Sequence, residues 1–411
     1  MSIAEAPVAT PAPAPSAPRH SRYSKEAFIA SFLGWTLDAF DFFVLIFVLP
    51  AVAHEFHRPI SDIAYTITIT LIFRPLGALL FGWLADIYGR RLPLLADVIF
   101  YSVVEVLSGL APSYRTFLLL RAFYGVGMGG EWGVGASLAM EAVPTHRRGF
   151  FSGLLQEGYA LGYLLAAAAY FLIFPAFGWR ALFFAGGLPA LLTFYIRTRV
   201  PESEAWERHR PNARMVASAI WFNLSAFAYL AVLLTVMNLL SHGTQDLYPT
   251  FLERERQLGA HLVAAVAIIY NLGAISGGLV FGAISDRMGR KRTMMVAVAM
   301  VLFLVPLWIF PQRLWLLVIG AFLMQFMVQG AWGVIPAHLV ELSPPAVRGL
   351  FPGLAYQLGV LLAANCAYTE SLLGAHLGYG NALALVAGSA AVIAVFVVGL
   401  GREQAGLDLH A

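Results

Sequence analysis

Two ten-residue stretches decide the fold, and the second repeats the first: Gly82-Trp-Leu-Ala-Asp86-Ile-Tyr-Gly89-Arg90-Arg91 and Gly282-Ala-Ile-Ser-Asp286-Arg-Met-Gly289-Arg290-Lys291. Both glycines, the aspartate and both final basic residues recur at an offset of 200 residues. Nine more residues follow the same offset: Gly130, Trp132, Gly133, Glu141, Pro144, Arg148, Gly149, Phe151 and Gly153 recur as Gly330, Trp332, Gly333, Glu341, Pro344, Arg348, Gly349, Phe351 and Gly353. Such a repeat predicts a chain built from two similar halves.

The composition is that of an integral membrane protein. Hydrophobic residues make up 59% of the chain and charged residues 12%, against about 25% charged residues in a typical soluble domain. Twelve apolar segments approach the roughly 20 residues that a helix needs to cross a bilayer. We therefore expect an all-α protein with twelve transmembrane helices, near residues 28–53, 62–86, 92–111, 115–140, 150–173, 179–197, 219–249, 260–285, 292–311, 313–340, 348–373 and 380–400.

The predicted spans fall into two groups of six. An N-terminal bundle covers residues 28–197 and a C-terminal bundle covers 218–401, with a polar cytoplasmic linker at 198–217. Residues 1–27, rich in Ala and Pro, should form a disordered tail, and residues 402–411 a second tail. With both ends inside, eighteen Lys and Arg residues lie on the inner side and six on the outer side. This bias predicts cytoplasmic termini, and the short tails favour a bacterial cytoplasmic (inner) membrane.

Several functions are disfavoured by the composition. The single Cys366 excludes an internal disulfide and a cysteine metal cage. The only two lysines, Lys25 and Lys291, do not follow a P-loop pattern, so no ATP site of that kind is expected. The net charge of +3 is small and lies in loops, where it sets membrane orientation rather than nucleic-acid binding. We expect a monomeric protein without cofactor or metal, and not an enzyme.

The stretch Asn238–Thr250 follows an apolar run and should continue a membrane helix until Pro249 breaks it. Its polar side chains fall within roughly 140° of one helical face, and His242 lies one turn from Asp246. Ionisable groups in a span generally face a bundle interior or a water-filled path, although a helix that runs into a polar loop would show the same residues. The expected path-lining residues here are Asn238, His242, Gln245 and Asp246.

This stretch also resembles a known signature. Asn-x-x-Ser-His-x-Thr-Gln-Asp-x-x-x-Thr, from Asn238 to Thr250, is similar to the signature of the fungal lactate/pyruvate permeases. These lie beside the bacterial sialic acid permeases in the sialate:proton symporter family of the major facilitator superfamily. The repeated Gly-x-x-x-Asp-x-x-Gly-Arg loops resemble that superfamily's cytoplasmic motif. The resemblance implies two pseudo-symmetric halves of six helices each, the major facilitator fold.

The function that this resemblance implies is proton-coupled symport of a small monocarboxylate such as lactate or pyruvate. A sialic acid:proton symporter is the nearest alternative, but a sugar acid would need more polar contacts than the mostly apolar C-terminal half offers. A sugar porter, another organic-anion porter or a drug:proton antiporter shares the fold but not the signature. A membrane receptor with this fold would usually carry a signalling domain or a long tail. The expected partners are a small carboxylate, protons and the lipid bilayer.

Charged residues inside the spans suggest how coupling works. Asp38 and Asp41 share one face of the first span, and a buried carboxylate can carry a proton. A structural ion pair with Arg121 is the alternative. Asp41, which lies deeper, is the first candidate for the proton site, and Glu131 in the fourth span is a further one.

Arg74 stands in the middle of the second span and requires a counter-charge. A substrate carboxylate fits because the guanidinium group can hold it with two hydrogen bonds. A permanent ion pair with Asp38 or Asp41 is the alternative. Tyr159 and Gln357 are further polar groups expected to line the cavity.

The repeated loops should form a gate. Asp86 and Asp286 can each pair with a neighbouring arginine or a facing helix terminus, and such pairs could part when the halves rock. We expect Glu141 with Arg148, and Glu341 with Arg348, to complete the two latches. Simple anchoring of tight loops is the alternative, because surface ion pairs are usually worth under about 1 kcal/mol. The expected gating residues are Asp86, Arg90, Asp286, Arg290, Glu141, Arg148, Glu341 and Arg348.

Overall fold

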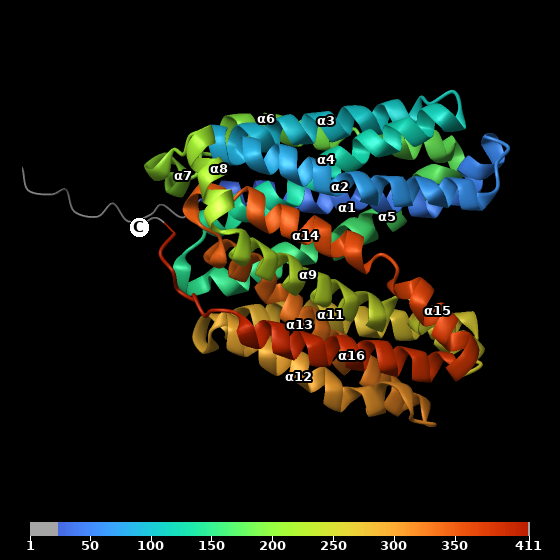
Figure 1. Cartoon of the computed structure of the whole chain (residues 1–411). Coiled ribbons are helices and arrows are strands. Elements are labelled where there is room, and N and C mark those ends of the chain that lie inside the picture. The colour runs from blue at the N-terminus through green and yellow to red at the C-terminus, as the bar shows by residue number, and fades with distance from the viewer. Residues whose placement is uncertain (1–23, 410–411) are drawn as a thin grey trace, which may run out of the picture.

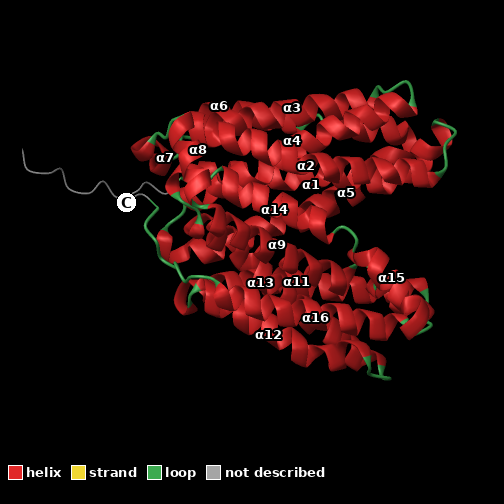
Figure 2. Ribbon diagram, viewed as in Figure 1, coloured by secondary structure: helices red, strands yellow, loops and turns green. Residues whose placement is uncertain are grey.

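The computed structural model describes residues 24–409, and all regular structure in that part of the chain is helical (Figure 2). Ten stretches are long and apolar enough to cross a membrane. One of them, Thr145–Arg199, has 55 residues and holds two crossings. Helix α4 makes a further crossing with 29 residues, although its glycines and charged side chains lower its hydropathy. The prediction of an all-α, twelve-span membrane protein is confirmed.

The first half of the chain contains six helices, which are α1 (Lys25–Glu55), α2 (Ile60–Tyr88), α3 (Arg91–Gly109), α4 (Tyr114–Ala142), α5 (Arg148–Ala185) and α6 (Pro189–Arg199). The turn between the fifth and sixth crossings lies inside α5 at Gly178, whose φ of 72° suits a residue without a side chain. The sixth crossing breaks again at Gly186, before α6. Much of the predicted tail, residues 1–23, lies outside the described residues, and Lys25 already begins α1.

The linker and the second half contain α7 (Glu204–His209), α8 (Ala213–Phe222), α9 (Leu224–Gln245), α10 (Tyr248–Arg254), α11 (Ala260–Met288), α12 (Arg290–Ile309), α13 (Leu314–Leu342), α14 (Leu350–Ala363), α15 (Cys366–Leu377) and α16 (Tyr379–Leu400). The predicted helix 219–249 was too long at both ends. It begins after a break at Asn223 and ends at Gln245, while Pro249 opens α10, where its missing N–H costs nothing.

The two bundles lie side by side, with α2 against α14 and α5 against α11 (Figure 1). Their ribbons converge at the end that carries α7, α8 and the C-terminal tail, here called the linker end, and diverge towards the opposite end (Figure 1). Glycines allow the close approach: a Cβ on Gly133 would lie 2.5 Å from the Cα of Gly353, and one on Gly153 would lie 2.3 Å from the carbonyl oxygen of Gly278. The charge bias of the loops predicts that the linker end is cytoplasmic.

Candidate functional site

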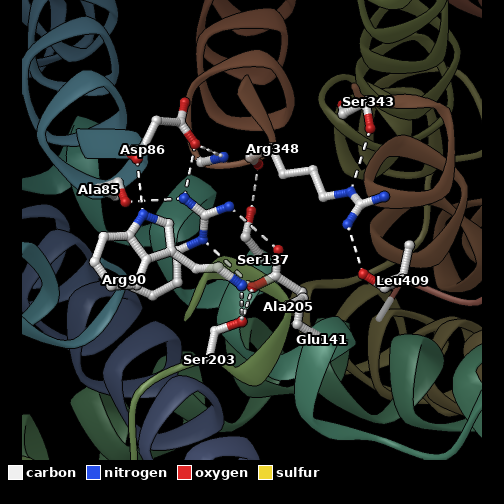
Figure 3. Close-up of polar contacts among 12 residues, drawn as sticks. Ala85, Asp86, Arg90, Ser137, Glu141, Ser203, Ala205, Ser343, Arg348 and Leu409 are labelled. Atoms are coloured by element: carbon white, nitrogen blue, oxygen red, sulfur yellow. Dashed lines mark hydrogen bonds and ion pairs between the residues drawn. The ribbon is translucent and has the colours of Figure 1, made fainter. Parts of the chain in front are cut away.

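The first latch at the linker end is built around Asp86, which is fully buried. Its Oδ1 accepts hydrogen bonds from Arg90 Nη1 at 2.7 Å and from the backbone N–H of Gly349 at 2.7 Å, and its Oδ2 accepts one from Leu350 at 3.0 Å (Figure 3). Gly349 and Leu350 form the N-terminus of α14, which favours a carboxylate through its free N–H groups. A residue of the first half thus caps a helix of the second half.

The second latch mirrors the first. Asp286 Oδ1 accepts from Arg290 Nη1 at 2.8 Å and from the N–H of Gly149 at 2.7 Å, and Oδ2 accepts from Phe150 at 3.0 Å. These N–H groups belong to the start of α5, so each half caps one helix of the other. The prediction that Asp86 and Asp286 pair with an arginine and a facing helix terminus is confirmed by this geometry.

The expected partners of the glutamates were wrong. Glu141 binds Arg90, with Nη2 and Oε1 3.2 Å apart, and accepts from Ser203 Oγ at 2.5 Å. Arg148 crosses to the other half and meets Glu341 at 3.0 Å, where Glu341 also binds Arg290. The sequence repeat could not show this, because it aligns equivalent positions of the two halves and says nothing about which side chains contact each other across them.

Arg348, the repeat of Arg148, has no carboxylate partner among the residues described. Its Nε donates to the Ser343 carbonyl at 3.3 Å and its Nη1 to the Leu409 carbonyl at 3.0 Å (Figure 3). Burial lowers the pKa of Arg348. Burial acts the same way on Arg90, but there the neighbouring Glu141 and Asp86 outweigh it and raise the pKa above the usual value. Buried ion pairs and helix caps therefore join the two halves at the linker end, with one cation left poorly compensated.

The polar residues of α9 gather near the end of that helix. His242 Nδ1 is 3.1 Å from Asp246 Oδ2, and the two side chains are 39% and 34% exposed. Asp246 caps the C-terminus of α9 and does not lie within the helix. Gln245 Nε2 donates to Gln325 Oε1 of α13 at 2.8 Å. Asn238 is buried and donates back to the Leu234 carbonyl at 2.8 Å, so its amide nitrogen is already engaged.

Arg74 lies between the halves, buried at 4% exposure. No carboxylate lies within ion-pair distance of it among the described residues, and its Nε and Nη2 atoms have no hydrogen-bond partner. Its guanidinium carbon is 5.9 Å from the ring centre of Tyr356 on α14. The alternative of a permanent ion pair with Asp38 or Asp41 is therefore not what this structure contains, and the cation has free donors.

An aromatic cluster surrounds Tyr356. The ring of Trp132 stacks on it at 4.4 Å, and Trp35 and Trp332 approach it edge-on at 6.3 and 5.9 Å. Tyr159 of α5 stacks on Trp35 at 5.5 Å and lies within electrostatic range of Arg74 and Asp246. These side chains come from both halves. They place Arg74, Tyr159 and the polar end of α9 around one region between the bundles.

Gln357, the residue after Tyr356, is buried and joins the halves directly. Its Nε2 lies 3.4 Å from the Gly129 carbonyl of α4, and its Oε1 has no partner. Among the described residues, the structure thus gives Gln357 one hydrogen bond across the interface and leaves one acceptor unused.

The predicted proton sites lie inside the first half. Asp38, Asp41 and Glu131 are all 0% exposed, and none of their carboxyl oxygens has a hydrogen-bond partner. Arg121, the alternative partner of the aspartates, instead binds Glu105 of α3 at 2.5 Å.

Three buried carboxylates are missing from the set of site residues predicted above. Asp97 and Glu105 lie on α3, and Glu370 lies on α15, all at 0% exposure. Both oxygens of Glu370 are without a hydrogen bond, and one is 3.5 Å from where a Cβ on Gly243 of α9 would lie. An acid inside an apolar span is a signal of function in its own right, and it would have identified all three.

Comparison with known proteins places this membrane protein in a transporter class. The profile described as "Major Facilitator Superfamily" matches residues 31–259, and "Sugar (and other) transporter" matches residues 215–401. The chain belongs to the Major Facilitator Superfamily. The solved proton:xylose symporter XylE superimposes with a TM-score of 0.76 at 19% identity, over 94% of this chain and 98% of that one, and so shares the fold.

Relatives in sequence are transporters of several organic compounds. The "Carboxylic acid transporter protein homolog" of Saccharomyces cerevisiae is 30% identical over 93% of this chain and 69% of its own. The "Probable 4-methylmuconolactone transporter" of Cupriavidus pinatubonensis is 31% identical over 95% and 93%. The "Sialic acid transporter NanX" of Escherichia coli is 27% identical over 91% and 93%. Membership of this family agrees with a multi-pass transporter and not an enzyme.

Proposed function

We propose that this protein is a secondary active transporter of organic acids, and specifically a proton-coupled symporter of a small monocarboxylate of the lactate/pyruvate class. The observation that carries the proposal is Arg74, a buried guanidinium with two unpartnered nitrogens in the region between the halves. A buried cation without an ion-pair partner is unfavourable, and a substrate carboxylate would supply that partner together with two hydrogen bonds.

The surroundings of Arg74 support the same proposal. His242 and Asp246 offer a polar edge with partly exposed atoms, while most nearby amides are already bonded within the protein. A small anion needs few further partners. The unpartnered acids of the first half supply groups able to hold the coupling proton. The closed gate at the linker end fits alternating access, in which that end opens after substrate binding.

A second candidate substrate is a planar unsaturated or aromatic carboxylate. The rings of Trp35, Trp132, Tyr159 and Tyr356 gather beside Arg74, and such rings stack on a flat apolar ligand. The muconolactone transporter among the relatives supports this candidate. The similarity to the sialic acid transporter NanX makes sialic acid a further alternative. A bulky sugar acid, however, needs more free polar groups than this region presents.

The test is uptake into proteoliposomes that contain the purified chain. Labelled lactate, pyruvate, acetate, nicotinate, cis,cis-muconate and sialic acid are compared with and without an inward acid gradient. We expect accumulation of a small carboxylate that collapses when a protonophore is added. Accumulation that survives the protonophore contradicts proton coupling, and accumulation of sialic acid alone would overturn the substrate class.

A further inference from the structure

Helix α3 carries a buried polar stripe that the substrate region does not use. Asp97, Tyr101, Glu105 and Ser108 follow one another at intervals of four, four and three residues, and all are 0% exposed. This spacing places them on one face of the helix. Helix α3 packs against α4, α6, α5 and α2 of its own half and lies away from the second half (Figure 1). Acids are costly at such a position in a membrane, which marks them as functional.

The end of the stripe further from the linker brings Glu105 beside Asp41 of α1. A Cβ on Gly186 would lie 2.5 Å from Glu105 Cγ and 2.6 Å from Asp41 Oδ1. The break in the sixth crossing therefore leaves just enough room for both acidic side chains. Arg121 donates from Nη2 to Glu105 Oε2 at 2.5 Å and to Ser108 Oγ at 2.7 Å. Both oxygens of Asp41 remain without a partner.

The other end of the stripe connects to further acids. Asp97 lies within electrostatic range of Glu131 and Asp38. Tyr101, whose hydroxyl has no partner, lies within range of all three and of Asp41. Other charged and titratable groups face these acids from the neighbouring helices. They are Asp38 and Asp41 of α1, Arg74 of α2, Arg121, Tyr124 and Glu131 of α4, and Tyr195 of α6.

Five buried carboxyl groups of the first half form what we call the acid column: Asp38, Asp41, Asp97, Glu105 and Glu131. Their charges do not balance, because only two cations among the described residues, Arg74 and Arg121, lie near them. Only Glu105 has an ion-pair partner. Ionised carboxylates without partners are strongly disfavoured in a dry interior. We therefore expect several of these acids to be protonated in this arrangement of the two halves.

We propose that Glu105 is the exchange partner of Asp41 in proton coupling, with Arg121 moving between them. In this structure the guanidinium group stabilises ionised Glu105, and Asp41 holds the proton. When Arg121 transfers its hydrogen bond to Asp41, the O–H bond of Asp41 breaks and an O–H bond forms on Glu105. The proton moves within the pair, the net charge of the three groups stays constant, and Asp97 extends the path along α3. This inference rests on the proposed proton symport.

The experiment compares the wild type with Glu105→Gln in proteoliposomes, using the carboxylate that the wild type accumulates best. Glutamine keeps the shape but cannot take the proton. We expect exchange of labelled for unlabelled substrate to remain within about threefold of wild type, while accumulation driven by an acid gradient falls at least tenfold. The number of protons entering per substrate, measured with a pH dye inside the vesicles, should fall with it.

Two controls make the result interpretable. Glu253→Gln makes the same substitution at an exposed glutamate outside the acid column, and should accumulate substrate nearly as the wild type does. Glu105→Asp keeps the acid and should restore coupled uptake with a shifted pH midpoint, which also serves if the glutamine variant does not reach the vesicles. Uphill accumulation by Glu105→Gln at the wild-type level, or an unchanged midpoint in Glu105→Asp, overturns the proposal. A wild type that shows no proton-driven uptake instead refutes the proposed symport itself.

Discussion

The two halves of this transporter repeat each other at the gate and differ in the middle of the membrane. The two aspartates make the same contacts, because Asp86 and Asp286 each bind an arginine and two backbone N–H groups of the facing half. Away from the latches, the first half buries five acids and two arginines. The second half instead offers the partly exposed pair His242 and Asp246 at the end of α9, together with buried Glu370. We propose that the shared latches control the movement of the halves. In this proposal the first half carries the coupling proton and the Arg74 clamp, and the second half adds a polar edge to the substrate region.

The largest effect should come from removing the proton site of the first half. Asp41→Asn keeps the shape of the side chain but cannot release a proton. We expect uphill uptake to be lost entirely, while exchange of labelled for unlabelled substrate continues. The two modes are measured in the same vesicles with and without an acid gradient. If uphill uptake persists, the proton is carried elsewhere in the column, with Glu131 next in line.

Arg74 links the two halves, and Arg74→Lys tests whether it holds the substrate carboxylate. Lysine keeps the charge but loses the planar fork and its contact with Tyr356. We expect substrate affinity to fall at least tenfold, about 1.4 kcal/mol. The matched control is Arg58→Lys, an exposed arginine whose nearest carboxylate oxygen, on Asp62, is 3.8 Å away, which should leave affinity unchanged. Equal affinities in both variants would exclude Arg74 as the clamp.

At the gate, the repeat partners Arg148 and Arg348 should behave differently. Arg148 forms a buried ion pair across the halves, and losing it should cost about 1.5 kcal/mol or more, shifting the ratio of closed to open gates roughly tenfold. Arg348 donates only to backbone carbonyls and carries a poorly compensated charge, so Arg348→Gln should shift that ratio less than about threefold.

The ratio of closed to open gates can be measured with spin labels. Cysteines introduced at the exposed positions Arg147 and Arg292, in a Cys366→Ala background, report the distance between the halves at the linker end. Arg148→Gln should populate a longer distance than Arg348→Gln does. The same distance distribution for both variants would show that the latches are equivalent in energy despite their different partners.

The sequence predicted the ion pairs of Asp86 and Asp286 because those pairs are local. Asp86 and Arg90 are one turn apart, and the repeat at Asp286 and Arg290 doubles the signal. The cross-half pair of Arg148 with Glu341 joins residues 193 positions apart, and no pattern within one half encodes it. Only part of the acid column was predicted, for the same reason. Asp41 was identified from its own span, whereas Glu105 becomes its neighbour only because α3 and the break at Gly186 lie beside α1 in the fold.

In the substrate region, too, local features were predicted from the sequence and contacts between distant helices were not. The one-sided face of α9 and the i, i+4 spacing of His242 and Asp246 follow from helical periodicity, and the structure has that contact. The break before Leu247 was not predicted, because Pro249 can begin a helix as readily as end one. The bond from Gln245 to Gln325 depends on α13, which is 80 residues away. The aromatic cluster around Tyr356 draws on five helices and has no sequence signature at all.

The smallest effect should be the coupling between His242 and Asp246, the pair that distinguishes the second half. The two groups are 3.1 Å apart but more than a third exposed, so solvent screens them and their interaction should be only about 0.5–1 kcal/mol. That is weaker than a fully buried pair would give. A double-mutant cycle on substrate affinity with His242→Ala and Asp246→Asn measures it, with membrane expression checked for each variant. We expect each single change to weaken binding and the double change to cost less than their sum, because one partner loses its orientation once the other is gone. Well-expressed variants with weak, additive effects would show that this end of α9 is a structural helix end, and substrate binding would then depend on Arg74 of the first half.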